Sequence, residues 1–259
     1  MNLVRRFSPL KNVLSKDTPD SVRYVRSGNG WLMRNLPGPS LSLPKPIDAD
    51  RIEARASETE RMGAMPLWKG YASVPDYPRA TTGSARRSDQ VRSTALAGYL
   101  FAWLAAERDA SIVVEFGTAF GVSGMYWLAG LKRSRHGRLL TFEPNAVWAD
   151  IARANLASIS QDFDLVTGTF EEYIDSTLKP GERIDIAFVD AIHTSAFVFH
   201  QFDILMPRMT PGGLILFDDI SFSEDMMSCW SAISRDPRIV ASATIGRRLG
   251  IVELAPAVG

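Results

Sequence analysis

The chain has 259 residues, and its 29 Lys and Arg balance 29 Asp and Glu, so its formal net charge is zero. This balance argues against a dedicated nucleic-acid-binding protein, which normally carries a strong basic excess. With 46% hydrophobic and 22% charged residues, the composition is that of a globular domain rather than a disordered chain.

The cysteine content and the lengths of the apolar runs indicate the cellular compartment in which the protein is expected. A single cysteine, Cys229, excludes an internal disulfide and a cysteine-based zinc site. No apolar run is long enough to span a bilayer, and the start of the chain, residues 1–14, lacks the apolar segment of a secretory signal. We therefore expect a cytoplasmic protein without a membrane partner. The mildly basic, serine-containing start leaves an organelle transit peptide as the alternative.

Residues 1–87 are predicted to be an irregular N-terminal arm, because proline-rich stretches interrupt any apolar period. One helix is expected over Asp48–Met62. The arm either packs or links subunits of a homo-oligomer, or it covers an active site as a lid through Trp68, Tyr71 and Tyr77.

From Ser88 onward, short apolar runs alternate with helical patterns, which predicts an α/β fold with a mainly parallel sheet covered on both faces. Residues 88–259 are read as one domain with a Rossmann-like, seven-stranded sheet and an antiparallel C-terminal finish around Gly246. The expected strands are Ile112–Phe116, Arg138–Glu143, Phe163–Thr167, Ile184–Val189, Gly213–Phe217, Arg238–Ala243 and Leu249–Leu254. The expected helices are Ser88–Glu107, Val122–Lys132, Ala146–Ser158, Phe170–Ser176, Ser195–Met206 and Ser223–Ser234.

A glycine turn follows the first of these strands, with Gly117 and Gly121 ahead of a helix. Glycine permits positive φ and close approach of a ligand to the backbone, and the helix N-terminus offers free N–H groups. The next strand ends in Glu143, 22 residues after Gly121 (143 − 121), where an acid can accept hydrogen bonds from ribose hydroxyls. The alternatives are a plain topological turn and a solvated strand-end acid.

A dinucleotide fingerprint, Gly-x-Gly-x-x-Gly, is not present, because Ala119 and Val122 occupy its second and third glycine positions. The Tyr-x-x-x-Lys pair of short-chain dehydrogenases is also absent from the sequence. An NAD-dependent oxidoreductase is therefore disfavoured.

The segment Glu115-x-Gly117-Thr118-x-x-Gly121-x-Ser123 resembles motif I of class I S-adenosylmethionine-dependent O-methyltransferases of the catechol, caffeoyl-CoA and bacterial natural-product types. Glu143, Phe188-Val189-Asp190 and the run from Pro211 to Asp219 match further family motifs in order. The resemblance covers roughly residues 88–254.

This resemblance implies S-adenosylmethionine as cofactor. Contacts with its methionine part are implied for Glu115, Gly117, Thr118 and Ser123, and further cofactor contacts are expected for Gly121 and Asp190. Glu143 would hold the ribose, and Thr169 and Phe170 would lie beside the adenine. In the metal-dependent branch, the positions of Asp190, Asp218 and Asp219 bind Mg²⁺.

An argument from charge supports a metal at the same place. Asp190, Asp218 and Asp219 follow two strands that we expect to be neighbours, so their carboxylates should converge and repel one another. A hard divalent cation with oxygen ligands, Mg²⁺ or another, would compensate this repulsion. The alternative is that Asp218 or Asp219 only caps the next helix.

His193 stands three residues after Asp190, where the catechol and caffeoyl-CoA enzymes have a lysine as general base. An imidazole, with an ordinary pKa of about 6.5, accepts a proton near neutrality. His193 and Asp190 are thus the expected catalytic residues; His136 and His200 are read as surface and structural residues.

The expected reaction is Mg²⁺-assisted methyl transfer to a hydroxyl of a small molecule, a natural product or catechol-like acceptor. Metal-independent O- or N-methyl transfer is the main alternative. A non-catalytic S-adenosylmethionine-binding protein is a further one.

Overall fold

The computed structural model describes residues 21–36, 41–73, 85–134 and 137–256. The strands are β1 (Val22–Arg26), β2 (Met65–Pro66), β3 (Ala85–Arg86), β4 (Ile112–Phe116), β5 (Arg138–Phe142), β6 (Phe163–Val166), β7 (Ile184–Val189), β8 (Met209–Phe217), β9 (Ile239–Ile245) and β10 (Leu249–Leu254). The α-helices are α1 (Trp31–Asn35), α2 (Ala49–Arg61), α3 (Ala95–Glu107), α4 (Val122–Leu131), α5 (Ala146–Ala157), α6 (Phe170–Thr177), α7 (Ser195–Leu205) and α8 (Glu224–Ile233). Short 3₁₀ turns are η1 (Lys69–Ser73), η2 (Ser88–Gln90) and η3 (Met206–Arg208).

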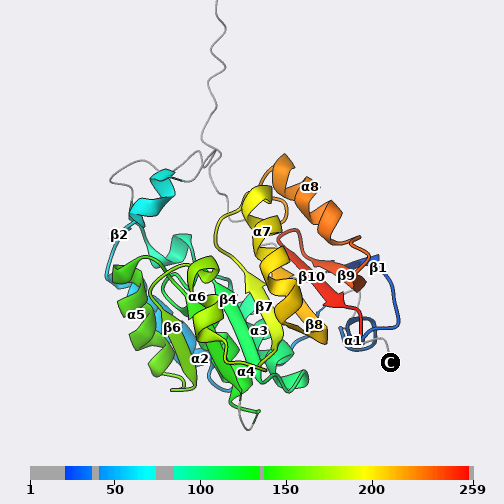
Figure 1. Ribbon diagram of the computed structural model, residues 1–259. Coiled ribbons are helices and arrows are strands. Elements are labelled where there is room, and N and C mark those ends of the chain that lie inside the picture. Colours follow the sequence, from blue (N-terminus) through cyan, green and yellow to red (C-terminus); the bar gives the residue numbers. More distant parts are fainter. Residues whose placement is uncertain (1–20, 37–40, 74–84, 135–136, 257–259) are drawn as a thin grey trace, which may run out of the picture.

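Within the described residues, one sheet of eight strands has the order β1-β9-β10-β8-β7-β4-β5-β6. Strands β8, β7, β4, β5 and β6 are parallel neighbours, whereas β10 pairs antiparallel with both β8 and β9. The mainly parallel α/β fold with an antiparallel finish is therefore confirmed. Figure 1 shows the helices on both sides of this sheet.

The eighth strand comes from the segment that the sequence predicted to be irregular. β1 pairs antiparallel with β9 and forms the edge of the sheet (Figure 1). The adjoining helix α1 is attached through Glu253 of β10, whose carboxylate accepts from the backbone N–H of Trp31 and of Leu32, both at 2.7 Å. A five-residue strand with half-exposed residues gave too weak an alternation for the sequence to show it.

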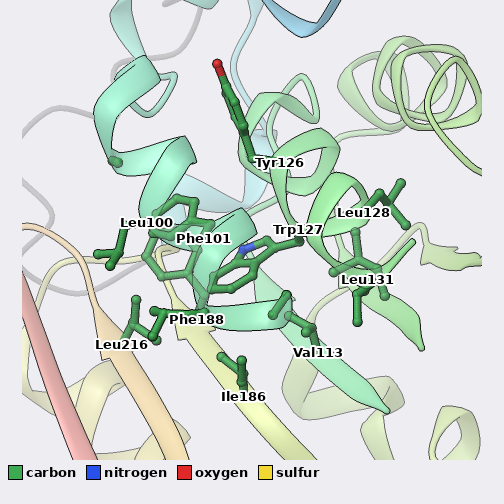
Figure 2. Close-up of a cluster of buried hydrophobic side chains, with 14 of the residues drawn as sticks. Leu100, Phe101, Val113, Tyr126, Trp127, Leu128, Leu131, Ile186, Phe188 and Leu216 are labelled. Carbon is green, nitrogen blue, oxygen red and sulfur yellow. The ribbon is translucent and has the colours of Figure 1, made fainter. Parts of the chain in front are cut away.

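Two hydrophobic layers cover the two faces of the sheet. Helices α1 to α5 pack on one face and α6 to α8 on the other, as the two clusters of buried residues show. Figure 2 shows the first layer, where Phe101 of α3 stacks on Trp127 of α4 with ring centroids 4.6 Å apart, and both contact Phe188 of β7. The predicted helix over Asp48–Met62 is α2, which buries Ile52 and Ala56 in this same layer. The boundary proposed at residue 88 stays a prediction.

Two predicted boundaries differ from the structure by four residues or more, and the others by at most two. The helix expected from Ser88 begins only at Ala95, because the Thr94 side chain caps it by accepting from the N–H of Ala97. Strand β8 begins at Met209, four residues before the expected start, and continues through a glycine, Gly212, with φ of +75°. Of the described residues, none lies in a helix that is long and apolar enough to cross a membrane.

Strands β4 and β7 are neighbours in the sheet, although β5 and β6 lie between them in the chain. The strand order therefore reverses direction at β4, and in open α/β sheets ligands bind at the carboxyl ends of the strands beside such a point. The loops after β4, β5, β7 and β8 converge there.

Candidate active site

The loop after β4 is a tight turn that only small residues can form. Gly117, Ala119 and Gly121 have φ of +83°, +47° and +81°, a region that favours glycine. The backbone N–H groups of Gly117 and Thr118 both donate to the carbonyl oxygen of Phe142 at 3.2 Å. The turn therefore lies close over β5 and leaves the N-terminus of α4 facing the end of the sheet.

Glu143 organises the loop after β5. One carboxylate oxygen accepts from the N–H of Ala119 at 2.8 Å and the other from the N–H of Asn145 at 2.8 Å. Burial raises the pKa of Glu143 to about 7, although these two hydrogen bonds act in the opposite direction. A carboxylate has further lone pairs, so Glu143 can also accept from a ligand hydroxyl at the cavity that it lines.

This first cavity lies beyond the ends of β4, β5 and β7, and its empty space of about 560 Å³ includes open solvent at its mouth. It is lined by Trp68, Tyr71, Phe116, Gly117, Phe142, Glu143, Pro144, Thr169, Phe170, Glu171, Ala191, Ile192, Phe197 and Gln201. Mostly apolar walls with a few polar groups are typical of a small-molecule site, and planar aromatic side chains provide surfaces for a flat ring.

Phe170 forms part of the wall. It stacks on Phe116 with centroids 3.9 Å apart and meets Phe142 edge-on at 5.7 Å, and only 1% of the residue is exposed. Thr169 is the N-cap residue of α6 beside it. Both predicted adenine contacts thus line the cavity.

Trp68 and the following turn η1 form part of the lining of this cavity. Trp68 and Tyr71 pack edge to face with ring centroids 5.5 Å apart and both line the cavity. The amide of Asn145 donates to the carbonyl oxygen of Pro66 at 2.8 Å and holds the segment before η1 in place. Two of the three aromatic residues predicted for a lid are therefore at the cavity, and Tyr77 lies outside the described residues.

A second, narrower cavity lies on the other side of the glycine turn, and its empty space of about 230 Å³ includes open solvent. Its lining residues are Val91, Arg92, Gly117, Thr118, Ala119, Phe120, Val122, Ser123 and Asp190. Gly117 borders both cavities, so one extended ligand could pass over it. Of the predicted cofactor contacts, Gly117, Thr118, Ser123 and Asp190 lie here.

Arg92 brings a positive charge to the second cavity, and the sequence analysis missed it. Its guanidinium is 2.5 Å from Glu53 and 3.5 Å from Glu60, both on α2. No motif marks Arg92, because its place depends on the packing of α2 against the loop before α3.

Glu115 lies beneath the glycine turn and lines neither cavity. It is fully buried, and Thr141 donates to its carboxylate at 2.9 Å. Burial raises the pKa of Glu115 to about 7, with hydrogen bonds from Ser123 and Thr141 opposing the shift. Gly121 likewise borders no cavity and caps α4. Both residues shape the turn, and their direct contact with a cofactor stays a prediction.

The predicted acids do converge. Nε2 of His193 lies 3.7 Å from Asp190 and 3.5 Å from Asp219. Burial, and after it the charge of Asp218, raise the pKa of Asp190 well above its ordinary value. The pKa of Asp219 is raised for the same two reasons.

The cation at this cluster is Arg248, which the sequence analysis did not single out. Its Nε lies 2.7 Å from one carboxylate oxygen of Asp218 and its Nη2 2.5 Å from the other. The same Nε is 3.1 Å from Asp219. Burial raises the pKa of Asp218, but the charge and hydrogen bonds of Arg248 outweigh it and lower that pKa. In the sequence, Arg248 is visible only as part of the basic pair at 247–248 in the predicted hairpin, and this pair does not indicate which acids it would contact.

The expected magnesium site does not fit this arrangement. Both oxygens of Asp218 already pair with the guanidinium of Arg248, whose positive charge stands where the resemblance requires a divalent cation. Over the part of the chain that the structure describes, no group of three or more His, Cys, Asp or Glu side chains is arranged to hold a metal ion.

Comparisons with known proteins agree with this geometry. Residues 114–220 match a family described as a methyltransferase domain. The O-methyltransferase TomG from Streptomyces achromogenes, involved in tomaymycin synthesis and solved with SAM, is 17% identical with a TM-score of 0.58, over 83% of this chain and 92% of that chain. An O-methyltransferase from Bacillus cereus, solved with SAH, is 20% identical with a TM-score of 0.56, over 83% of this chain and 93% of that chain.

A further crystal structure, a putative O-methyltransferase from Klebsiella pneumoniae, is 21% identical with a TM-score of 0.56, over 86% of this chain and 94% of that chain. No curated protein matches the sequence. Residues 114–220 match a methyltransferase-domain family, and the chain has the fold of solved O-methyltransferases, as the resemblance implied.

Proposed function

We propose that this chain, with its methyltransferase domain at residues 114–220, transfers a methyl group from S-adenosylmethionine to a hydroxyl of a small molecule. The observation that carries the proposal is the pair of cavities that Gly117 borders, one lined mainly by aromatic and apolar residues and one that includes Arg92 and Asp190. S-adenosylmethionine has matching halves, an adenosine and an amino acid. The two solved relatives whose titles name SAM or SAH bind the donor or its product, which supports the same cofactor here.

The adenosine would occupy the first cavity, with its ring against Phe170 and beneath Trp68. Glu143, fixed by two backbone N–H groups, would accept from the ribose hydroxyls. The methionine carboxylate would lie at Arg92 and Ser123, near the N-terminus of α4, where the helix dipole favours negative charge. When bound, the cofactor supplies a methyl group on a positively charged sulfur.

His193 is the proposed general base. Its Nε2 faces the two carboxyl groups of Asp190 and Asp219, which would orient the ring and stabilise the imidazolium that forms. The hydroxyl proton of the acceptor passes to His193, and an oxygen lone pair forms the new O–C bond as the S–C bond breaks. The bonding electrons stay on sulfur, so charge and atoms balance. No step needs a metal, and the magnesium dependence expected from the sequence is not part of this mechanism.

A small hydroxylated natural product is the proposed acceptor class. The aromatic ring of Phe222 stands 5.6 Å from that of His193 and is 44% exposed, so it provides a surface beside the base for an aromatic acceptor. The role of TomG in the synthesis of a natural product supports this class.

The test has two stages. Addition of S-adenosylhomocysteine should raise the melting temperature, because a ligand that binds only the native state stabilises it. Transfer of a labelled methyl group to a panel of hydroxylated aromatic compounds should then be measured for the wild type and for His193→Ala.

The matched control is His200→Ala, which changes an exposed histidine on α7. His193→Ala should lower kcat by a factor on the order of 10²–10⁴, with unchanged affinity for S-adenosylhomocysteine. A kcat equal to that of His200→Ala would show that His193 is not the general base. No rise in melting temperature at saturating S-adenosylhomocysteine would show that the chain does not bind this cofactor.

A further inference from the structure

The acid cluster at the ends of β7 and β8 already contains a cation that belongs to the chain. Arg248 meets Asp218 through two parallel N–H···O contacts at 2.7 and 2.5 Å, and the same guanidinium reaches Asp219 at 3.1 Å. Planar two-point pairing of this kind is the strongest arrangement that arginine forms with a carboxylate. Asp218 is 2% exposed, so little solvent competes for its oxygens.

Backbone contacts from the loop after β8 and from the β9–β10 hairpin fix the position of Arg248. The N–H of Ile220 donates to the carbonyl oxygen of Arg248 at 3.0 Å, and the hydroxyl of Ser221 donates to that of Arg247 at 2.8 Å. The flanking residues Ile245 and Leu249 pair directly in the β9–β10 hairpin. The guanidinium is therefore held at Asp218 by the fold and not by the side-chain contact alone.

A divalent cation at Asp218 would have to bind beside the guanidinium of Arg248. Magnesium requires oxygen ligands at about 2.0–2.1 Å in a near-octahedral arrangement, and each oxygen of Asp218 already accepts a contact from Arg248. Arginine does not give up its proton in proteins, so its charge opposes the approach of a second cation. Removing one partner of a buried ion pair is also costly, because the other is left uncompensated.

We propose that Arg248 is the resident cation of this active site, in the place where the related metal-dependent enzymes hold Mg²⁺. The proposal rests on the proposed function, because it concerns the same site. Asp219 joins the two halves of the site: one oxygen faces Arg248 and the other faces His193. The side chain of Arg248 is 45% exposed, which leaves part of the guanidinium open to an acceptor oxygen that becomes negatively charged beside His193.

The arrangement also sets the substrate class. A metal ion selects acceptors with two adjacent oxygens, because both bind it. A guanidinium that is only partly exposed can pair with an acceptor that has a single oxygen. The preferred acceptor is therefore an aromatic compound with a single hydroxyl, placed between His193 and Phe222, rather than a catechol.

The experiment measures metal binding directly and does not need the acceptor. Full-length protein with S-adenosylhomocysteine is titrated with Mn²⁺, and free Mn²⁺ is followed by electron paramagnetic resonance. The wild type should show no saturable site up to a concentration on the order of 1 mM, the weak end of protein sites for divalent cations. The variant Arg248→Met keeps an unbranched chain but frees the Asp218 carboxylate, and it should bind one Mn²⁺ with a Kd at least about tenfold below that 1 mM limit.

The double variant Arg248→Met with Asp218→Asn is the control, and it should lose the gained site. One saturable Mn²⁺ in the wild type that Asp218→Asn abolishes would overturn the proposal, and so would the absence of any gain in a folded Arg248→Met. The wild-type titration decides the question if Arg248→Met does not fold. Binding of S-adenosylhomocysteine in the same samples is a separate readout: its absence would end the proposed function, whatever the metal result.

Discussion

A Cβ atom on residue 117 would lie 1.9 Å from the backbone carbonyl oxygen of Asp190. The contact joins the turn after β4 to the loop after β7, the two loops that border both cavities. It explains why the first glycine of the motif is required here: the close approach lets the chain pass between the two binding regions with no side chain in the way.

Gly117→Ala should therefore abolish binding of S-adenosylhomocysteine, measured by calorimetry, and destabilise the fold. The control is Gly63→Ala, which has a similar φ of +86° but no atom within 4 Å of the added Cβ. Gly63→Ala should cost only backbone strain, about 1 kcal/mol, and keep the affinity. Equal effects of the two variants would show that strain alone, and not the contact with Asp190, governs position 117.

Arg92→Ala should weaken binding of the amino acid part of the cofactor and leave binding of the adenosine part unchanged. The loss of a charged partner should weaken binding of S-adenosylhomocysteine by about 2 kcal/mol, or roughly 30-fold in Kd. Methylthioadenosine, which lacks the amino acid part, should bind as well as it does to the wild type. Arg87→Ala, which changes an exposed arginine paired with Asp89, is the control, and both ligands should bind it normally. An equal loss for both ligands would place the methionine part elsewhere.

Trp68→Ala should affect both ligands equally, unlike Arg92→Ala. The loss of an aromatic wall over the adenosine cavity should weaken S-adenosylhomocysteine and methylthioadenosine alike, by about 1–3 kcal/mol. Phe222→Ala is the useful comparison, because Phe222 stands at His193 and not at this cavity. It should raise KM for the acceptor and leave cofactor affinity unchanged. Unaltered cofactor binding by Trp68→Ala would show that the segment before η1 does not cover the bound ligand.

Glu115 should make stability depend on pH. Burial raises the pKa of Glu115 from 4.5 to about 7. Between these two pH values the folded state keeps a proton on Glu115 that the unfolded state has released. The contribution of Glu115 is fully present below about pH 4.5 and is lost as the pH rises through about 7. The loss amounts to about 3 kcal/mol.

Glu115→Gln removes this ionisation while it keeps the shape of the side chain. Chemical unfolding at a series of pH values from 5 to 8.5 should show a smaller decline in the free energy of unfolding for the variant than for the wild type. Parallel curves would mean that Glu115 stays ionised in the folded protein. Glu143, which also has a pKa raised to about 7, should account for part of the remaining slope.

The elements that the sequence predicted well are those whose signal is local. β4 and β7 match their expected bounds because each is a mainly apolar and almost fully buried run, interrupted by one acid, Glu115 or Asp185. Helix α5 starts after Asn145, which caps it. The convergence of Asp190, Asp218 and Asp219 followed from the neighbouring parallel strands alone.

What the sequence did not show depends on pairing between distant segments. Arg248 reaches Asp218 only because the β9–β10 hairpin folds back onto β8, and no periodicity fixes where its loop residues point. Arg92 reaches the second cavity only because α2 holds it through Glu53. In both cases the position of an arginine depends on contacts between distant segments. At the acid cluster this arginine is Arg248, and its charge is the reason that the metal expected from three acids did not fit.

The strand β1 and the helix α1 have a consequence for how the chain can be shortened. Without residues before 88, strand β9 would present an open row of unpaired backbone groups, a known template for association between chains. The buried carboxylate of Glu253 would also lose the two N–H donors of α1. A truncated protein that begins at residue 88 should therefore aggregate rather than yield an active, isolated catalytic half.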